Sequence, residues 1–410
     1  MNALDILKER GFVKQCSNET VLKKLFDSSK MVFYVGFDAT ADSLHIGNLF
    51  PIMAMAHLQK AGHTPIALIG GGTTFVGDPS GKDEMRKIIA PAEIKANGQK
   101  ILAQLKRYLE IGKSKGMFLD NSDWLLPLKY IDFLREIGTH FRVNEMVKNE
   151  GYRRRLERKE GLSFIEFNYQ LLQAFDFLTL FEKHACRLQM GGDDQWGNIL
   201  AGVELVRKMR GKEVFALTFP LIETAGGHKM GKTEAGAVWL DADKVSPYEF
   251  YQYWINIDDR DAIRFLKIYT FLALEEINKL AKLKGKDLRE AKEILAFEAT
   301  KITHGEKEAQ KAKIASEAVF GKKSKDFSDL PTVFISRPEI TTGILILDLL
   351  VKAKVASSKS EAFRLINQGG IYIDKRRISD QNTVIRTDSF REGILLLGKG
   401  KKQYYRVVLK

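Results

Sequence analysis

Two short segments combine residue types that bind phosphate. Residues 45–48 read HIGN, and residues 229–233 read KMGKT. A helix entrance presents unpaired backbone N–H groups to phosphate oxygens, and His45 can add a side-chain donor. Lys229 and Lys232 bring two ammonium groups on a glycine-flanked loop. Together the segments predict a site for phosphate chemistry on ATP, and the alternatives are a histidine that only caps its helix and a solvated loop.

A glycine-rich segment at residues 70–82 lies between them in the sequence. Its glycines allow a ligand to approach the backbone closely, and Asp78 places a carboxylate there. Lys82 and Arg86 can meet the outer phosphates. The segment lacks the spacing of a P-loop, and an ordinary flexible turn is the alternative.

A polar stripe interrupts an apolar helix predicted over residues 163–184. Tyr169, Gln173 and Asp176 are spaced i, i+4, i+7, so they share one face of that helix. Burying such groups without partners costs several kcal/mol, roughly 2–7 for a neutral group alone. A polar ligand and an internal hydrogen-bond network both satisfy the stripe.

The segment at residues 191–198, GGDDQWGN, follows an apolar run and opens another helix. Two glycines permit close backbone approach. Asp194 and Gln195 suit ribose hydroxyls or an ammonium group. The alternative is that Asp193 or Asp194 caps the following helix.

These residues are far apart in the sequence, so the fold must bring them together at one edge of a sheet. Near-continuous apolar runs at residues 31–37, 65–69, 117–119, 186–190 and 214–219 are separated by segments with helical spacing. Buried parallel strands alternating with helices have this pattern. We therefore expect an α/β fold with a Rossmann-like, doubly wound parallel sheet over residues 1–222, whose ligands bind at the carboxyl ends of the strands.

The rest of the chain changes character. We expect a mobile loop and connection at residues 223–245, an all-helical domain at 246–320, a linker at 321–338 and a small basic α/β RNA-binding module at 339–410. From residue 341 onward there are fourteen basic and six acidic side chains. This excess indicates an anionic polymer as partner, and a solubilising surface is the alternative.

Composition excludes several classes of protein. The chain has 410 residues, a net charge of +13 and two cysteines, Cys16 and Cys186. It therefore encodes neither a disulfide framework nor a zinc site, and we expect no tightly bound metal. The apolar runs are too short for a membrane span, and acids near the start argue against a signal peptide. We expect a cytoplasmic protein.

The motifs in this order resemble the class I aminoacyl-tRNA synthetases, and within them the bacterial tyrosyl family. HIGN occupies the position of the family's HIGH motif, and KMGKT occupies the position of its KMSKS motif. Residues 34–44, 77–82 and 191–198 also match, as do the tail segments 356–362 and 368–373, which resemble a ribosomal-protein RNA-binding module. Three positions differ from the family's motifs. Asn48 replaces a histidine, and a serine is replaced both at Gly231 and at Asp193.

The resemblance implies roles for matching residues. Tyr34 and Asp176 would bind the phenol hydroxyl of L-tyrosine, and its ammonium group would meet Tyr169, Gln173 and Asp78. The catalytic residues would stabilise the phosphates of ATP: Thr40, His45, Lys82, Arg86, Lys229, Lys232 and Thr233. Contacts with ATP or the adenylate would come from Gly36, Asp38, Gly47, Asn48, Gly192, Asp194, Gln195 and Lys232.

The family also implies a reaction and partners. Tyrosine would attack Mg²⁺–ATP, with Mg²⁺ entering as part of the substrate, and the tyrosyl group would pass to the terminal adenosine of tRNA(Tyr). A homodimer is expected. The rivals are a tryptophanyl enzyme, a non-catalytic RNA-binding protein that retained the fold, and a metabolic nucleotidyltransferase; the basic tail disfavours the first and third, and retention of His45 and both lysines disfavours the second.

Overall fold

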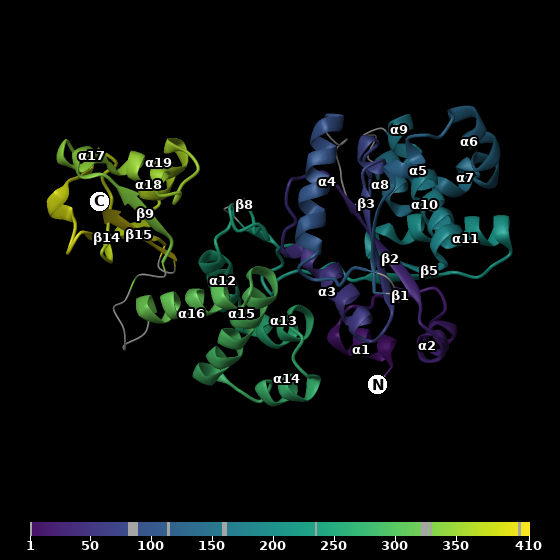
Figure 1. Ribbon diagram of the computed structural model, residues 1–410, viewed down its shortest axis with the longest axis horizontal. Helices are drawn as coiled ribbons and strands as arrows, with labels where there is room; N and C mark the ends of the chain where they lie inside the picture. The colour runs from purple at the N-terminus through teal and green to yellow at the C-terminus, as the bar shows by residue number, and fades with distance from the viewer. Residues whose placement is uncertain are drawn as a thin grey trace. The chain divides into compact units, whose positions relative to one another are not determined.

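The computed structural model describes residues 2–80, 89–112, 115–157, 162–233, 236–320, 327, 330–400 and 403–410. Two predicted site residues, Lys82 and Arg86, lie outside this part of the chain, and for Lys232 and Thr233 only the backbone is described. The chain forms two compact units: Met1–Asp241 with Asp258–Lys282, and Ala242–Ile257 with Leu283–Lys410. Figure 1 gives the element labels used below.

The first unit contains the predicted doubly wound sheet. Its strand order is β1-β6-β5-β2-β3-β4, and the five strands from β6 to β4 are parallel. The order reverses between β2 and β5, which is where such sheets bind ligands. The strands are β1 (Gln15–Cys16), β2 (Val32–Asp38), β3 (Thr64–Gly70), β4 (Met117–Asp120), β5 (Cys186–Gly192) and β6 (Phe215–Phe219).

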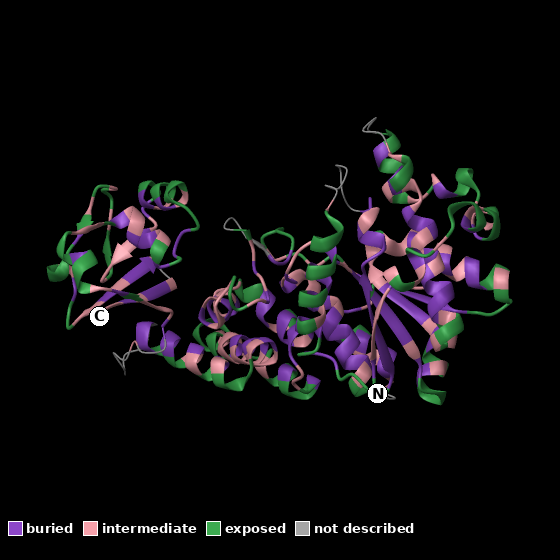
Figure 2. Cartoon of the chain, turned by 45° about the horizontal axis from the view of Figure 1, so that its top comes forward, coloured by how far each residue is buried: buried purple, intermediate pink, exposed green. Residues whose placement is uncertain are grey.

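Burial explains why these strands could be predicted. All seven residues of β3 and all five of β6 are buried, because helices cover both faces of the sheet. Figure 2 shows these buried strands at the centre of the unit and exposed residues on its outer helices. Strand β1 was not predicted; it is two residues long and pairs antiparallel with β6 at the sheet edge.

Helices of the first unit surround the sheet (Figure 1). The predicted helix 163–184 is in fact two helices, with Asn168 between them donating its amide to the Phe164 carbonyl oxygen. The helices are α1 (Ala3–Arg10), α2 (Glu19–Ser28), α3 (Ile46–Lys60), α4 (Pro91–Leu105), α5 (Ser122–Leu125), α6 (Tyr130–Glu136), α7 (Val143–Met146), α8 (Glu150–Glu157), α9 (Phe164–Phe167), α10 (Tyr169–His184), α11 (Trp196–Arg210), α13 (Ala262–Tyr269) and α14 (Leu274–Leu280).

Helices α13 and α14 depart from the predicted single domain at residues 246–320, because residues 258–282 group with the sheet unit. The buried Arg10 of α1 donates to the carbonyl oxygens of Lys267 and Leu272 at 2.8 and 2.6 Å. These bonds satisfy a buried guanidinium and fix the end of α13 to α1. In the second unit, α12 (Pro247–Ile255), α15 (Leu288–His304) and α16 (Glu306–Phe320) pack against one another.

The C-terminal part of the second unit is a five-stranded sheet of order β12-β11-β14-β15-β9 with helices against it. Strand β9 pairs parallel with β15, so the folded module begins before the predicted boundary at residue 339. Its elements are β9 (Thr332–Ile335), α17 (Arg337–Thr341), β10 (Ile344–Leu345), α18 (Ile346–Lys352), α19 (Lys359–Asn367), β11 (Ile371–Ile373), β12 (Arg376–Arg377), β13 (Val384–Ile385), β14 (Ile394–Lys399) and β15 (Gln403–Leu409).

Among the described residues, the helices are all too short or too polar to cross a bilayer.

Candidate active site

A pocket of about 810 Å³ lies at the carboxyl ends of the first unit's strands. Residues that the sequence placed in four separate motifs line it together, and the stripe of residues 169–176 is not part of this lining. The predicted residues on its wall are His45, Gly47, Asn48, Asp78, Gly192, Asp194 and Lys229. The topology thus unites the predicted phosphate and ribose contacts at the point where the strand order reverses.

His45 caps helix α3 and also faces the pocket. Its Nδ1 accepts a hydrogen bond from the Gly47 N–H at 3.0 Å, which requires Nδ1 to be unprotonated. In the neutral ring the hydrogen therefore sits on Nε2, so His45 can donate from that atom. The Asn48 Oδ1 accepts from the His45 backbone N–H at 3.1 Å and completes a capping box. Asn48, a departure from the family word, thus stabilises the helix entrance.

Gly231 lies directly against this entrance. Its φ is +81°, and a Cβ atom there would lie 2.9 Å from the backbone nitrogen of Gly47. The chain just beyond pairs with the same entrance, since the Ile46 N–H donates to the Val238 carbonyl oxygen at 3.0 Å. Glycine replaces the family's serine here because, in this conformation, a side chain would collide with backbone.

Tyr34 and Asp176 form a buried polar pair within apolar surroundings. The Tyr34 hydroxyl has no hydrogen-bond partner among the residues that the structure describes. Burial raises its pKa well above the ordinary value, and the nearby negative charge of Asp176 adds to the rise. A buried hydroxyl without a partner is rare in proteins, so this group points to a ligand that would satisfy it.

Two residues that the sequence reasoning missed hold Asp176 in place. The Asn121 Nδ2 donates to one carboxylate oxygen at 2.9 Å, and the Trp124 Nε1 donates to the other at 2.7 Å. Asn121 cannot rotate freely, because its Oδ1 accepts from the Gly72 N–H. Both residues follow β4. Because ligand-binding residues lie beyond the carboxyl ends of parallel strands, the same reasoning applied to β4 would have indicated them.

The predicted ammonium contacts lie in a second hydrogen-bonded group. Asp78 accepts from the Ser80 N–H at 2.9 Å and from the Gln195 Nε2 at 2.7 Å. Burial, with a smaller contribution from Asp38, raises the pKa of Asp78 to about 6. The Tyr169 hydroxyl lies 3.4 Å from the Asp38 carboxylate.

Asn198, which was not predicted, supports this group by donating to Ser80 Oγ. Gln173, on the predicted stripe, has a buried Oε1 with no partner among the described residues. Among the described residues, an internal hydrogen-bond network therefore satisfies only some of the polar groups of the stripe.

The remaining predicted residues have different surroundings. Thr40 and Gly36 are exposed, the first in the turn after β2 and the second within that strand. Gly192 allows the Asp194 carboxylate to approach, since a Cβ atom would lie 2.4 Å from its Oδ1. Helix α11 has no side-chain cap, so the capping alternative for this segment is wrong. Asp193 instead accepts from Gln15 Nε2 and Thr218 Oγ1 and so joins the edge strand β1 to its neighbour β6.

The resemblance implies that Asp176 binds the phenol hydroxyl of tyrosine, and this role predicts how tyrosine affinity depends on pH. Burial raises the pKa of its carboxyl to about 7, against the opposing effect of its two donors. A phenol O–H donates best to the ionised carboxylate, so binding of that group releases a proton near pH 7. We expect the dissociation constant for tyrosine to fall by roughly fivefold to tenfold between pH 6 and 8 and then to level off. Calorimetric titration would measure this; phenylalanine, which lacks the hydroxyl, should not show the fall.

Comparisons with known proteins identify the family of the chain. The family described as "tRNA synthetases class I (W and Y)" matches residues 27–321, and "Tyrosine--tRNA ligase SYY-like C-terminal domain" matches residues 323–407. The tyrosine–tRNA ligase of Clostridium tetani is 51% identical over 409 residues, covering 100% of this chain and 99% of its own. That of Acetivibrio thermocellus is 51% identical over 408 residues, covering 100% of this chain and 99% of its own.

Solved structures show the same fold. A C-terminally truncated mitochondrial tyrosyl-tRNA synthetase of Aspergillus nidulans is similar with a TM-score of 0.70 at 30% identity, covering 78% of this chain and 94% of that one. A tryptophanyl-tRNA synthetase of Encephalitozoon cuniculi has a TM-score of 0.57 at 13% identity, covering 75% and 87%. Because both types share the fold, the full-length sequence identity decides between them. The chain belongs to the class I aminoacyl-tRNA synthetases, and among these to the bacterial tyrosyl-tRNA synthetase family.

Proposed function

We propose that the chain joins L-tyrosine to tRNA(Tyr) through tyrosyl-adenylate, with its specificity set by Tyr34 and Asp176. The observation that carries this is the unsatisfied Tyr34 hydroxyl buried near the Asp176 carboxylate. A phenol hydroxyl placed between them donates to Asp176 and accepts from Tyr34, so each polar group gains a partner. An indole offers no hydroxyl for this pair, which makes the tryptophanyl alternative less suitable.

The opposite end of the amino acid carries an ammonium group. Tyr169, Gln173 and Asp78 supply oxygen atoms for it. The carboxylate of Asp78 gives the strongest attraction when ionised, and Gln195 holds one of its oxygens in place. This arrangement directs the tyrosine carboxylate toward the entrance of α3.

The first step joins that carboxylate to ATP. A carboxylate oxygen attacks the α-phosphorus of Mg²⁺–ATP, the bond to the bridging oxygen breaks, and pyrophosphate leaves. Positioning and charge stabilisation suffice for such a transfer. His45 and Thr40 donate to the γ-phosphate, and the cations Lys82, Arg86, Lys229 and Lys232, with Thr233, neutralise the leaving pyrophosphate. Gly36, Asp38, Gly47, Asn48, Gly192, Asp194 and Gln195 surround the adenylate.

In the second step the terminal adenosine hydroxyl of the tRNA attacks the tyrosyl carbonyl, and AMP leaves. No side chain forms a covalent bond, which accords with a pocket that contains donors and cations. We place the protein in the cytoplasm, where its tRNA substrate is made.

Tyrosine-dependent exchange of pyrophosphate into ATP tests the first step. We expect exchange with tyrosine and none above background with tryptophan or phenylalanine at equal concentration. Exchange with tryptophan but not tyrosine would refute the proposal, and absence of exchange with every amino acid would favour the non-catalytic RNA-binding alternative.

The basic C-terminal module is assigned to tRNA. Deletion from residue 321 onward removes the whole five-stranded sheet, including β9, and leaves the pocket residues untouched. We expect pyrophosphate exchange to stay within about twofold of the full chain, while kcat/KM for tRNA charging falls at least about tenfold, because phosphate contacts supply much of the affinity for nucleic acid. Charging that is unchanged by the deletion would contradict the assignment.

We further propose that the chain is a homodimer that pairs through helices α5 to α9. Large apolar side chains are exposed there, among them Ile131 at 70% and Phe164 at 68%. Apolar surface concentrated in this way is typical of protein interfaces. We expect sedimentation to give a dimer for the parent chain and a monomer for Ile131→Asp. Phe363→Asp, which changes an exposed residue of α19, is the control and should remain dimeric; a monomeric parent would refute the proposal.

A further inference from the structure

The segment that carries Lys229 is a short hairpin. The Met230 N–H donates to the Ile222 carbonyl oxygen at 2.9 Å, and the Thr224 N–H donates to the His228 carbonyl oxygen at 2.8 Å. Gly227, with φ of +79°, makes the turn. The backbone at Lys229 is therefore part of a hydrogen-bonded hairpin, and its position depends on what holds the hairpin.

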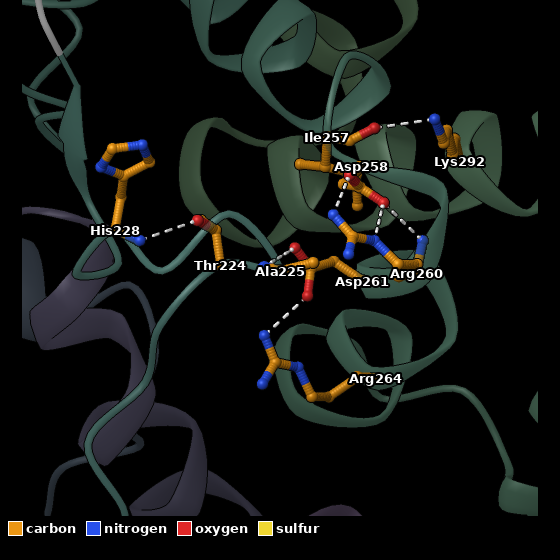
Figure 3. A network of polar contacts seen from close by, with 9 residues as sticks. All are labelled: Thr224, Ala225, His228, Ile257, Asp258, Arg260, Asp261, Arg264 and Lys292. Atoms are coloured by element: carbon orange, nitrogen blue, oxygen red, sulfur yellow. Dashed lines mark hydrogen bonds and ion pairs between the residues drawn. The ribbon is translucent and has the colours of Figure 1, made fainter.

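An acid–base pair at the start of α13 holds the hairpin on one side (Figure 3). Asp261 Oδ2 accepts from the Ala225 N–H at 2.7 Å, and Asp261 Oδ1 accepts from Arg264 Nη2 at 2.6 Å. Arg264 also donates to the Glu223 carbonyl oxygen. The N-cap residue and the first turn of α13 thus bind two backbone groups of the hairpin.

Asp261 is unusual for a residue at a helix start. It occupies the N-cap position of α13, where an aspartate usually accepts from the helix's own N–H groups, yet it makes no such bond. Its side chain is only 3% exposed, and both oxygens are used by the hairpin and Arg264. A buried carboxylate is costly unless paired, so these bonds hold the hairpin firmly.

The far end of α13 is attached to the helix that begins at His45. The ring of Phe271 lies 5.1 Å from that of His57, and the Lys60 ammonium lies 3.9 Å from the Phe271 ring centre. His57 and Lys60 belong to α3. Helix α13 therefore connects α3 to the hairpin, and the pairing of Ile46 with Val238 closes the ring of contacts on the other side.

We propose that Asp261, with Arg264, is a positioning residue that sets Lys229 relative to His45. The proposal rests on the role assigned above to Lys229 in stabilising pyrophosphate. It adds two residues that lie outside every motif of the sequence and that touch no substrate. Without their bonds the hairpin keeps its own ladder but loses its fixed distance from the entrance of α3.

Asp261→Asn and Asp258→Asn make a matched comparison. Both residues lie in the same short segment, but the bonds drawn for the Asp258 side chain go to Arg260 (Figure 3). For Asp261→Asn we expect kcat for tyrosine-dependent pyrophosphate exchange to fall tenfold to a hundredfold, since small displacements of a catalytic group have effects on the order of a hundredfold. The KM for tyrosine should stay within twofold. Asp258→Asn should leave both constants within twofold.

Backbone hydrogen exchange of the peptide covering residues 222–230 gives a second measurement that does not depend on activity. We expect hydrogen exchange to be at least tenfold faster than in the parent chain for Asp261→Asn and for Arg264→Gln. For Asp258→Asn we expect the parent's exchange rate. Arg264 is half-exposed, so its variant decides the question if Asp261→Asn does not fold. Unchanged hydrogen exchange in the folded variants, or equal changes in Asp258→Asn, would overturn the proposal. A parent chain without tyrosine-dependent activity would refute the proposed function, while hydrogen exchange would still test the positioning.

Discussion

Replacing Asp176 with alanine should lower kcat/KM for tyrosine in pyrophosphate exchange by at least about a hundredfold. The change removes the acceptor that we propose for the substrate hydroxyl and leaves the donors Asn121 and Trp124 without their partner. Hydrogen bonds to charged groups contribute roughly 1.5–3 kcal/mol, and about 1.4 kcal/mol corresponds to tenfold. The loss of the bond to substrate and the disturbance of the two donors together give this magnitude.

Phenylalanine separates recognition of the hydroxyl from damage to the pocket. We expect kcat/KM for phenylalanine to change much less in Asp176→Ala, so the preference for tyrosine collapses. Tyr34→Phe is the matched variant, because it removes a hydroxyl that has no partner among the described residues of the unliganded chain. It should fold as stably as the parent, and its kcat/KM for tyrosine should fall about tenfold. Equal losses for tyrosine and phenylalanine in Asp176→Ala would show that packing, and not the hydroxyl, sets the effect.

The parts of the fold predictable from sequence were those with a local pattern. Strands β2 to β6 are near-continuous apolar runs because both sheet faces are covered, and their order in the chain implied a parallel sheet. Strand β1 has two residues and no period to recognise. The place of α13 depends on Arg10. This side chain also donates to the carbonyl oxygen of Thr270, which lies 260 residues further along the chain. Helical spacing shows that a helix forms and which face is apolar, but not which unit covers that face.

The same limit applies to the site. Residues whose type and spacing have a meaning of their own, such as those of HIGN and the stripe from Tyr169 to Asp176, were predictable. Asn121, Trp124 and Asp261 act by holding other groups, and any polar side chain of suitable length can do so. Their importance comes from distant partners: 55 residues separate Asn121 from Asp176, and 36 separate Ala225 from Asp261. Positioning residues therefore emerge only with the structure.

The second large effect is expected for His45→Ala. If Nε2 donates to the γ-phosphate as charge develops, its loss should lower kcat for exchange by about 10²- to 10³-fold, the range found when one transition-state donor is removed. The KM for tyrosine should stay within twofold, because the contacts that we propose for tyrosine come from β2, α10 and the segment after β3. Parallel losses in tyrosine affinity would argue against a role confined to the transition state.

His45 also caps α3, so the alanine variant removes two things at once. His45→Ser separates them, because serine is a good N-cap whose short hydroxyl cannot reach where the imidazole reaches. The serine variant should regain most of the roughly 0.5–2 kcal/mol of stability that loss of a cap costs, measured by denaturant unfolding, yet remain as slow as alanine in exchange. Recovery of activity with serine would assign the loss to the helix entrance alone. Slow exchange in a well-capped variant would assign it to the imidazole, because the cap and the Asn48 bond to the His45 backbone persist while only the side-chain donor is missing.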